Sequence, residues 1–379
     1  MVLGCVLVTV LPGELMAETA NRFMLAVVRQ AKGWSQKDLA EAAGIDPAVV
    51  SRAENGLLDL SGSKLESVAG ALGCPVELLT DGRHVEGVQP TCLHHRRRSS
   101  KLTVATKQRI EGLAHLTRLS VQGLLGGLEL EPEIALEPMD IDIYEDPAEV
   151  ARLMRARWRI ASGPVPNVIS LLEAVGILVV IRPLGTTDQD AVSSWPHGVD
   201  QSPIMLLNTG LAPDRERFTA IHELGHMLMH RIPTDSMEAE ADAFAAEFLA
   251  PAAEVGPDLA GLTTGDLARL LELKAKWGIS IAALIRRAHD LELISERQYR
   301  EFQIRINRLG WRRVEPAAGI TPELPRTVDR VIDVHRTEHG YSVDELAKVA
   351  LMTPASFTRH YLPPAQTPRT VLRIVRDTK

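Results

Sequence analysis

The sequence predicts a mainly α protein with a small β-sheet, an α+β fold. Three observations support this class. Apolar residues recur at helical spacing through most of the chain, the aromatic content is only 4%, and just two short apolar runs look like strands. These runs cover residues 177–181 and 204–207 and lie among helical patterns. The 379 residues are enough for two or three domains, each with its own core.

Residues 21–82 carry five short helical patterns separated by turn signals. The second pattern opens on Ser35 with Asp38 three residues later, which is a capping-box arrangement at a helix N-terminus. Gly44 allows the chain to turn sharply, and Gly56 ends the third pattern. The region is therefore predicted to be a five-helix domain.

This region resembles the Xre/Cro-type helix-turn-helix family, whose members bind double-stranded DNA. The resemblance implies that the helix starting at Asp46 lies in the major groove. Its candidate DNA contacts are Gln36, Ala48, Ser51 and Arg52, because arginine can pair bidentately with guanine and a helix N-terminus is placed for a phosphate. The residues that carry the resemblance are Trp34-Ser35-Gln36-Lys37-Asp38-Leu39-Ala40, Gly44 at the turn, and Val50-Ser51-Arg52-Ala53-Glu54-Asn55-Gly56.

An alternative stays open for residues 21–82, namely a helical bundle used for protein contact or dimerisation. The region holds eight acidic residues against six basic ones. Pro47 and Ala48 also offer no side-chain donor or acceptor at positions where such domains often read bases. Residues 83–120 hold eight basic residues against two acidic ones and could supply attraction for phosphates. We expect a basic linker and one helix over residues 83–135.

A long helix predicted over residues 213–230 carries the motif His222-Glu223-Leu224-Gly225-His226. Residues four apart lie on one face of a helix, so both imidazoles can reach a single metal ion. Glu223 is the candidate catalytic residue, since it lies beside the metal and can take a proton from bound water. The motif therefore predicts a zinc site on this helix.

A catalytic zinc requires a third protein ligand, and the next predicted helix offers acidic candidates. Glu238 and Asp242 are four residues apart, so Glu238 can bind the metal while Asp242 accepts the N–H of a ligating histidine. Glu240 is the alternative ligand. Glu238 could instead form a capping box with Asp235.

Three further features could also take part in the chemistry of the motif. His230 is about 12 Å along the helix from His222, too far to share a metal, so we expect it to end the helix near its dipole. His289 and Tyr299 could stabilise an oxyanion, although core or surface roles are the stronger alternatives. The run 204–207 is the candidate strand edge for pairing with an extended peptide substrate.

The segment from Arg215 to Pro251 resembles the ImmA/IrrE family of zinc peptidases. The resemblance implies a zincin-like, gluzincin-type domain in which His222, His226 and Glu238 bind one Zn²⁺ per chain and Glu223 acts as general base. It also implies a transcriptional repressor as the protein substrate. The matching residues are the RFTxxHELGHxLxH pattern from Arg217, the ExEADxFAAExLxP pattern that follows it, and Trp277-Gly278-Ile279-Ser280 through Gly310-Trp311-Arg312-Arg313-Val314-Glu315-Pro316.

Composition and charge narrow the remaining possibilities. The net charge of −7 means that any DNA binding must come from a local patch. Three scattered cysteines form no disulfide or CxxC spacing, which favours a cytoplasmic protein. No apolar run approaches the roughly 18 residues that span a bilayer, so no membrane association is expected. Residues 1–20 lack the basic part and cleavage site of a signal peptide and are expected to be a disordered leader.

The rest of the chain is predicted to be a peptidase core over residues 136–260, a helical extension over 261–315 and a helical segment over 316–379. Within the last segment, residues 341–347 and 353–357 resemble a helix-turn-helix again, and a plain helical appendage is the alternative.

Together these features predict a zinc-dependent regulatory endopeptidase with its own DNA-binding domain. Its substrate would be a repressor, either a partner or another copy of the chain itself, and a homodimer is a further expectation. One alternative is a helix-turn-helix regulator whose metal domain senses a signal or binds a partner without proteolysis. Another is an antitoxin-like module whose peptidase fold serves only as a protein-binding surface. The presence of Glu223 favours the enzyme, because a metal sensor needs no general base.

Overall fold

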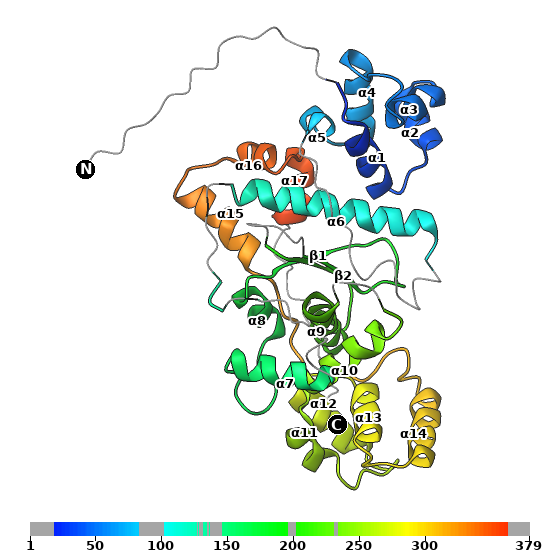
Figure 1. Ribbon diagram of the computed structural model, residues 1–379, viewed down its shortest axis with the longest axis vertical. Coiled ribbons are helices and arrows are strands. Elements are labelled where there is room, and N and C mark those ends of the chain that lie inside the picture. Colours follow the sequence, from blue (N-terminus) through cyan, green and yellow to red (C-terminus); the bar gives the residue numbers. More distant parts are fainter. Residues whose placement is uncertain are drawn as a thin grey trace, which may run out of the picture. The chain divides into compact units, whose positions relative to one another are not determined.

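The computed structural model of the chain divides into two compact units, Met1–His84 and Val85–Lys379 (Figure 1). The expected leader over residues 1–20 lies outside the described residues except for Thr19 and Ala20. These two residues are ordered against the chain near Leu60, because Thr19 forms a β-bridge with Ser61 and the Ala20 amide donates to the Leu60 carbonyl at 2.8 Å. The structure describes residues 19–82, 102–126, 128, 132–134, 136, 146–195, 202–230 and 234–362.

The first unit has the predicted five helices in its described part. Ser35 and Asp38 form a complete capping box at the start of the second helix, and Gly44 ends that helix with φ of 66°. Asp46 then caps the third helix through the Ala48 amide. The helices are α1 (Arg22–Ala31), α2 (Gln36–Ala43), α3 (Pro47–Glu54), α4 (Gly62–Leu72) and α5 (Val76–Thr80).

The second unit is mainly helical around one small sheet. Its elements in chain order are α6 (Val104–Leu124), α7 (Pro147–Arg157), α8 (Val168–Ala174), β1 (Leu178–Arg182), β2 (Ala191–Ser194), β3 (Ile204–Asn208), α9 (Pro213–Met229), α10 (Met237–Leu249), α11 (Ala252–Leu259), α12 (Leu267–Trp277), α13 (Ile281–Asp290), α14 (Glu296–Arg308), α15 (Thr327–Thr337), α16 (Val343–Val349) and α17 (Pro354–Tyr361). The predicted fold class is therefore confirmed.

The sheet of the second unit has the strand order β1-β3-β2, with β1 parallel and β2 antiparallel to β3. This order corrects the expectation that residues 204–207 form an exposed edge, because β3 lies between the other two strands and its five residues are all buried. The edge beside β3 is β2, a strand the sequence did not reveal. Its sequence Ala-Val-Ser-Ser is short and offers little apolar alternation.

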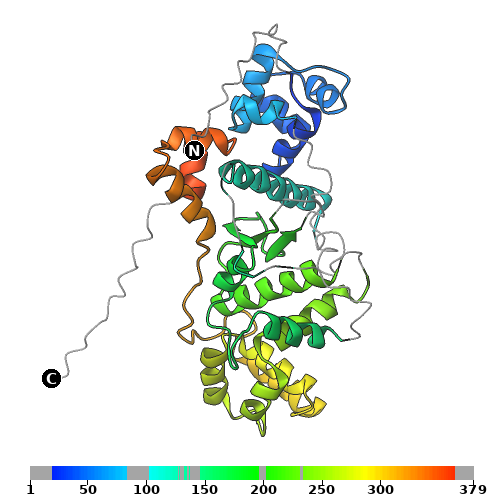
Figure 2. The ribbon, with the colours of Figure 1, turned by 60° about the vertical axis from the view of Figure 1, so that its left-hand side comes forward.

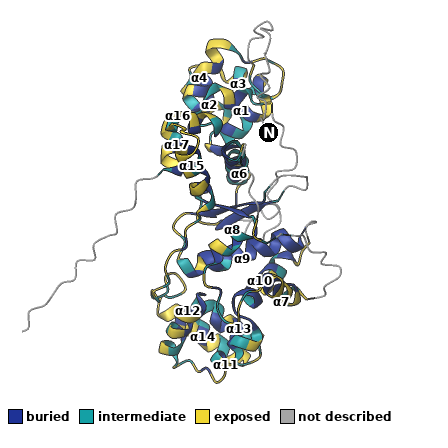
Figure 3. Ribbon diagram, turned by 90° about the vertical axis from the view of Figure 1, so that its left-hand side faces the viewer, coloured by how far each residue is buried: buried dark blue, intermediate teal, exposed yellow. Residues whose placement is uncertain are grey.

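Both faces of the sheet are covered by helices (Figures 1 and 3). Alternate residues of a strand point to opposite faces. Accordingly Val179 and Met205 belong to the core shared with α8, α9 and α10, whereas Val180 and Leu206 belong to a second core shared with α6 and the C-terminal helices. The sheet is thus the middle of three layers, which explains why its strands are apolar on both sides.

Helices α9 and α10 pack closely because a glycine lies between them. A Cβ on Gly225 would come 3.1 Å from a ring carbon of Phe244 and 3.4 Å from the Ala241 Cα. Glu247 near the end of α10 binds Arg287 from α13 and Arg152 from α7. These contacts fix the rotation and position of α10 against the surface of α9.

The C-terminal helices α15, α16 and α17 pack on α6 within the second unit (Figure 2). The hydroxyls of Tyr361 and Ser120 lie 2.9 Å apart, and the His335 ring meets the Leu124 carbonyl at 2.6 Å. Within residues 316–379 the described part is helical in α15, α16 and α17, whereas residues 316–326 form no helix, and residues 363–379 lie outside the described residues. None of the described helices combines the length and apolarity that crossing a membrane requires.

Replacing Gly123 by alanine should weaken the packing of α16 on α6. A Cβ at this position would overlap the backbone carbonyl of Val349, and overpacking of this kind costs about 1–3 kcal/mol. We expect a lower Tm for the second unit in calorimetry. Gly256→Ala on α11 is the matched control, because nothing lies within 4 Å of its added methyl. Equal Tm values for the two variants would contradict the tight α6–α16 contact.

Glu216 should make the second unit less stable as the pH rises. Burial and the nearby Glu323 carboxylate raise the pKa of Glu216 from 4.5 to about 7. The folded chain then binds more protons than the unfolded chain between these two values, so stability falls as the pH rises through that window. Glu216→Gln should raise the Tm at pH 8 and change it little at pH 4.5. A Tm gain of equal size at both pH values would disagree with this account.

Candidate functional site

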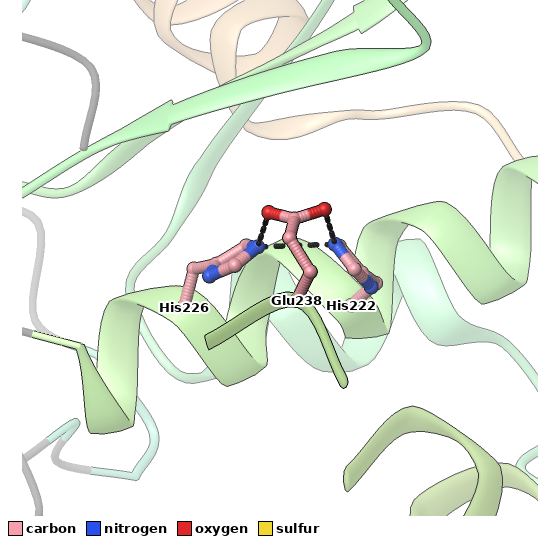
Figure 4. Close-up of side chains that lie close together, drawn as sticks. All are labelled: His222, His226 and Glu238. Atoms are coloured by element: carbon pink, nitrogen blue, oxygen red, sulfur yellow. Dashed lines mark hydrogen bonds and ion pairs between the residues drawn. The ribbon is translucent and has the colours of Figure 1, made fainter. Parts of the chain in front are cut away.

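The histidines of the HExxH motif lie one turn apart on the buried helix α9. His222 is 7% exposed, Glu223 is fully buried and His226 is 1% exposed. The two Nε2 atoms lie 3.0 Å apart and face the same point in space (Figure 4). The helical spacing predicted this convergence, and the structure shows it.

Glu238 on α10 completes the group (Figure 4). Its Oε1 lies 3.1 Å from Nε2 of His226 and its Oε2 lies 3.8 Å from Nε2 of His222. Ligand atoms from all three residues lie within 4.8 Å of one another, the only such group found in the described residues. The capping-box alternative for Glu238 fails, because the N-cap of α10 is Ser236 and it has no side-chain cap.

The geometry of these three side chains fits a divalent metal ion. Bonds of about 2.0–2.2 Å at tetrahedral angles place two ligand atoms about 3.3–3.6 Å apart. The separations of 3.0, 3.1 and 3.8 Å bracket that range. The Glu238 side chain is 29% exposed whereas that of His226 is 0% exposed, so the group is open to solvent on the Glu238 side. Two nitrogens, one oxygen and an open side form the donor set of a catalytic zinc.

Asp242 orients His222 as the sequence predicted. Its Oδ1 lies 2.8 Å from Nδ1 of His222. A carboxylate can only accept, so Nδ1 carries the proton and Nε2 keeps a lone pair directed at the shared point. The one-turn spacing of Glu238 and Asp242 therefore supplies both a candidate metal ligand and the hydrogen-bond partner of His222.

His230 and Glu240 perform the same task for His226, and the sequence did not predict this. Oε2 of Glu240 accepts from Nε2 of His230 at 2.9 Å, and Nδ1 of His230 lies 2.9 Å from Nδ1 of His226. Because His230 donates to Glu240, its Nδ1 must accept from His226, which leaves Nε2 of His226 unprotonated. Glu240 is thus bound to His230 rather than acting as the third ligand.

His230 also ends α9, as expected, but it is buried at 4% exposure. Burial and the neighbouring His226 lower the pKa of His230 to about 4. A neutral ring at physiological pH is what the hydrogen-bond chain to His226 requires. The four-residue spacing between His226 and His230 was the available signal for their contact.

Ser193 on the edge strand β2 contacts the candidate catalytic residue. Its hydroxyl donates to Oε2 of Glu223 at 2.8 Å. This contact places β2 against α9 beside the motif. Sequence reasoning missed Ser193 because it missed the strand that carries it.

His289 and Tyr299 do not take part in this group. Their rings lie 4.6 Å apart, and His289 binds Glu296 at 2.9 Å. The described contacts of both side chains lie within α13 and α14. The structure therefore supports the core or surface roles given as the stronger alternatives.

The candidate DNA-contacting residues occupy the α2–turn–α3 segment of the first unit. Ala48 and Arg52 are exposed on α3 and Ser51 is half-buried. Gln36 begins α2, as predicted, but its amide donates to Glu54 at 2.7 Å, and Glu54 also pairs with Arg29 at 2.6 Å. The contact of each of these residues with DNA stays a prediction.

Two stretches of the chain match known protein families. Residues 25–79 match the helix-turn-helix family, and residues 172–289, which include the candidate metal-binding group, match the IrrE N-terminal-like domain. The chain is thus similar to an Xre-type helix-turn-helix and to an ImmA/IrrE-type domain, in that order along the sequence. No significant match to the chain was found among curated proteins or among solved structures.

Asp242→Asn should weaken zinc binding about 10- to 100-fold, because the hydrogen bond that fixes the His222 tautomer is lost. Competition with a chromophoric zinc chelator measures the affinity. Asp235→Asn is the matched control, since Asp235 is exposed just before α10 and its replacement removes the same charge. Equal weakening by both variants would show a general electrostatic effect instead.

Proposed function

We propose that this chain is a zinc-dependent regulatory endopeptidase with its own DNA-binding domain. The observation that carries the proposal is the convergence of His222, His226 and Glu238 on one point, with Glu223 on the same helix between the two histidines. The match of residues 172–289 to the IrrE N-terminal-like domain supports it.

The three ligand side chains would hold one zinc ion per chain. A zinc ion held there acidifies water and polarises a peptide carbonyl as a Lewis acid. The hydrogen bonds that His222 donates to Asp242 and His226 donates to His230 keep the metal-facing nitrogen of each of the two donating histidines free of a proton. Both nitrogens can therefore bind a cation without first losing a proton.

Glu223 would accept the proton of the attacking water and pass it to the leaving amine. It is fully buried, and Ser193 holds one of its carboxylate oxygens at 2.8 Å. A hydroxyl that donates to Oε2 fixes the orientation of the carboxylate. We assign Ser193 the role of positioning this base.

The substrate would bind as an extended peptide along β2. This strand is an edge of the described sheet and its Ser193 touches Glu223. An edge strand offers a row of unpaired backbone groups that an extended peptide can pair with. A peptide paired in this way lies beside the ligand group, which is open to solvent on the Glu238 side.

The protein substrate in this proposal is a transcriptional repressor, either a partner or another copy of the chain, and the setting is the cytoplasm. The N-terminal helix-turn-helix match supports a role in gene regulation. It would bring the peptidase to double-stranded DNA where repressors are bound. A homodimer fits the same proposal, because helix-turn-helix proteins commonly bind paired half-sites.

Glu223→Gln should abolish proteolysis while leaving the metal ligands in place. We expect the zinc-loaded full chain to cut a helix-turn-helix protein encoded beside it, or itself, and the variant to be slower by about 10²- to 10⁴-fold. Intact-mass spectrometry measures the products, and zinc titration confirms that the variant still binds metal. Identical metal-triggered DNA release by both proteins, with no cleavage by either, would favour a sensor and contradict the peptidase.

A further inference from the structure

The C-terminal helices α16 and α17 resemble the N-terminal helix-turn-helix in sequence. Residues 35–52 align with residues 342–359 without a gap. Both segments begin with a serine, share Leu-Ala in the first helix, Pro-Ala at the start of the second, and an arginine five residues after that proline. The identical pairs are Ser35/Ser342, Leu39/Leu346, Ala40/Ala347, Ala43/Ala350, Pro47/Pro354, Ala48/Ala355 and Arg52/Arg359.

The two segments begin with the same hydrogen bonds. The Ser35 amide and hydroxyl each donate to the Asp38 carboxylate at 2.8 Å. The Ser342 amide and hydroxyl donate to the Glu345 carboxylate at 2.8 and 2.7 Å. Both serines therefore form complete capping boxes at matching positions.

The turns between the two helices also agree. Gly44 has φ of 66°, and at the equivalent position Leu351 has φ of 54°. The amide of the following residue donates to Ala40 at 3.0 Å in one copy and to Ala347 at 2.8 Å in the other. A leucine rarely adopts left-handed backbone, so its presence here shows that the turn geometry is imposed by the surrounding structure.

Burial follows the same pattern in both copies. Leu39 and Leu346 are fully buried in their first helices, and so are Val50 and Phe357 in their second helices. The helix before each pair is followed within three residues by a glycine at the same offset, Gly33 with φ of 75° and Gly340 with φ of 70°. The agreement thus extends over three helices rather than one motif.

We propose that α17 is a second DNA-reading helix and that the chain binds DNA through two helix-turn-helix modules. On α17 the side chains of Ala355, Thr358 and Arg359 are exposed, at the positions that Ala48, Ser51 and Arg52 hold on α3. Neither arginine has a hydrogen bond or an ion pair with any other described side chain. Each guanidinium is available to pair bidentately with guanine in the major groove.

The differences between the copies show how the second one is anchored. Glu54, which pairs with Arg29 in the first copy, is replaced by Tyr361, whose hydroxyl lies 2.9 Å from that of Ser120 on α6. The second copy is therefore held by α6 rather than by an internal ion pair. Val343 stands where Gln36 does, so this position contributes no side-chain donor to a phosphate.

Two reading modules in one chain would recognise two sequence elements in one operator. Linked modules raise each other's effective concentration at the DNA, so binding to both elements is tighter than binding to either alone. The pairing of half-sites that a helix-turn-helix dimer achieves by symmetry is available here within a single chain.

The test is selection of binding sites by the full chain from a pool of random-sequence duplex DNA. All proteins carry Glu223→Gln, so that the outcome does not depend on proteolysis. We expect the parent to enrich two sequence elements, Arg52→Ala to lose one of them and Arg359→Ala to lose the other. Each arginine variant should bind the parent's selected site about 5- to 150-fold more weakly.

Arg297→Ala is the matched control, because its exposed side chain on α14 carries the same charge and lies on the same unit. It should enrich the parent's elements with unchanged affinity. If Arg359→Ala lowers the Tm of the second unit, Thr358→Ala replaces it with the same expectation. A parent that enriches a single element, or an Arg359→Ala variant that behaves like Arg297→Ala, would overturn the proposal and leave α17 a protein contact.

Discussion

The close packing of α10 on α9 is the constraint on which the candidate metal centre depends. Two of the candidate ligands come from α9 and the third from α10, so a shift of either helix separates them. Gly225 makes the approach possible, because Phe244 and Ala241 occupy the space that a side chain there would need. Glu247 fixes the other end of α10 through Arg287 and Arg152. The glycine within HExxH is thus required for the packing of α10 against the candidate catalytic motif.

The hydrogen bonds around this helix contact all favour the same tautomer of the two motif histidines. One carboxylate from α10 accepts from His222, and a second, Glu240, acts on His226 through His230. Both histidines are therefore held in the tautomer that presents an unprotonated Nε2. The carboxylates that achieve this lie on the same helix as Glu238. The packing of α10 on α9 therefore brings in the third candidate ligand and also fixes the tautomers of His222 and His226.

The covered sheet determines where a substrate and a second DNA-binding module can lie. One face of the sheet supports α9, and the other supports α6 with the C-terminal helices. The proposed peptide pairing therefore uses an edge of the described sheet, and the edge strand that contacts Glu223 is β2. On the opposite face α6 anchors a copy of the helix-turn-helix whose turn contains Leu351 instead of glycine.

The sequence by itself determined the features that depend on residues close in the chain. Helical spacing determined that His222 and His226 share a face and that Glu238 and Asp242 do, and capping and turn residues located the five N-terminal helices. Only the tertiary structure decided which strand is an edge, that Ser193 reaches Glu223, and that Glu240 binds His230. These outcomes depend on how separate elements pack, and local periodicity contains no information about that. For the proposed second helix-turn-helix, the sequence pattern predicted the two helices. The left-handed turn at Leu351, which has no glycine, depends on the surrounding core and could not be predicted from the sequence.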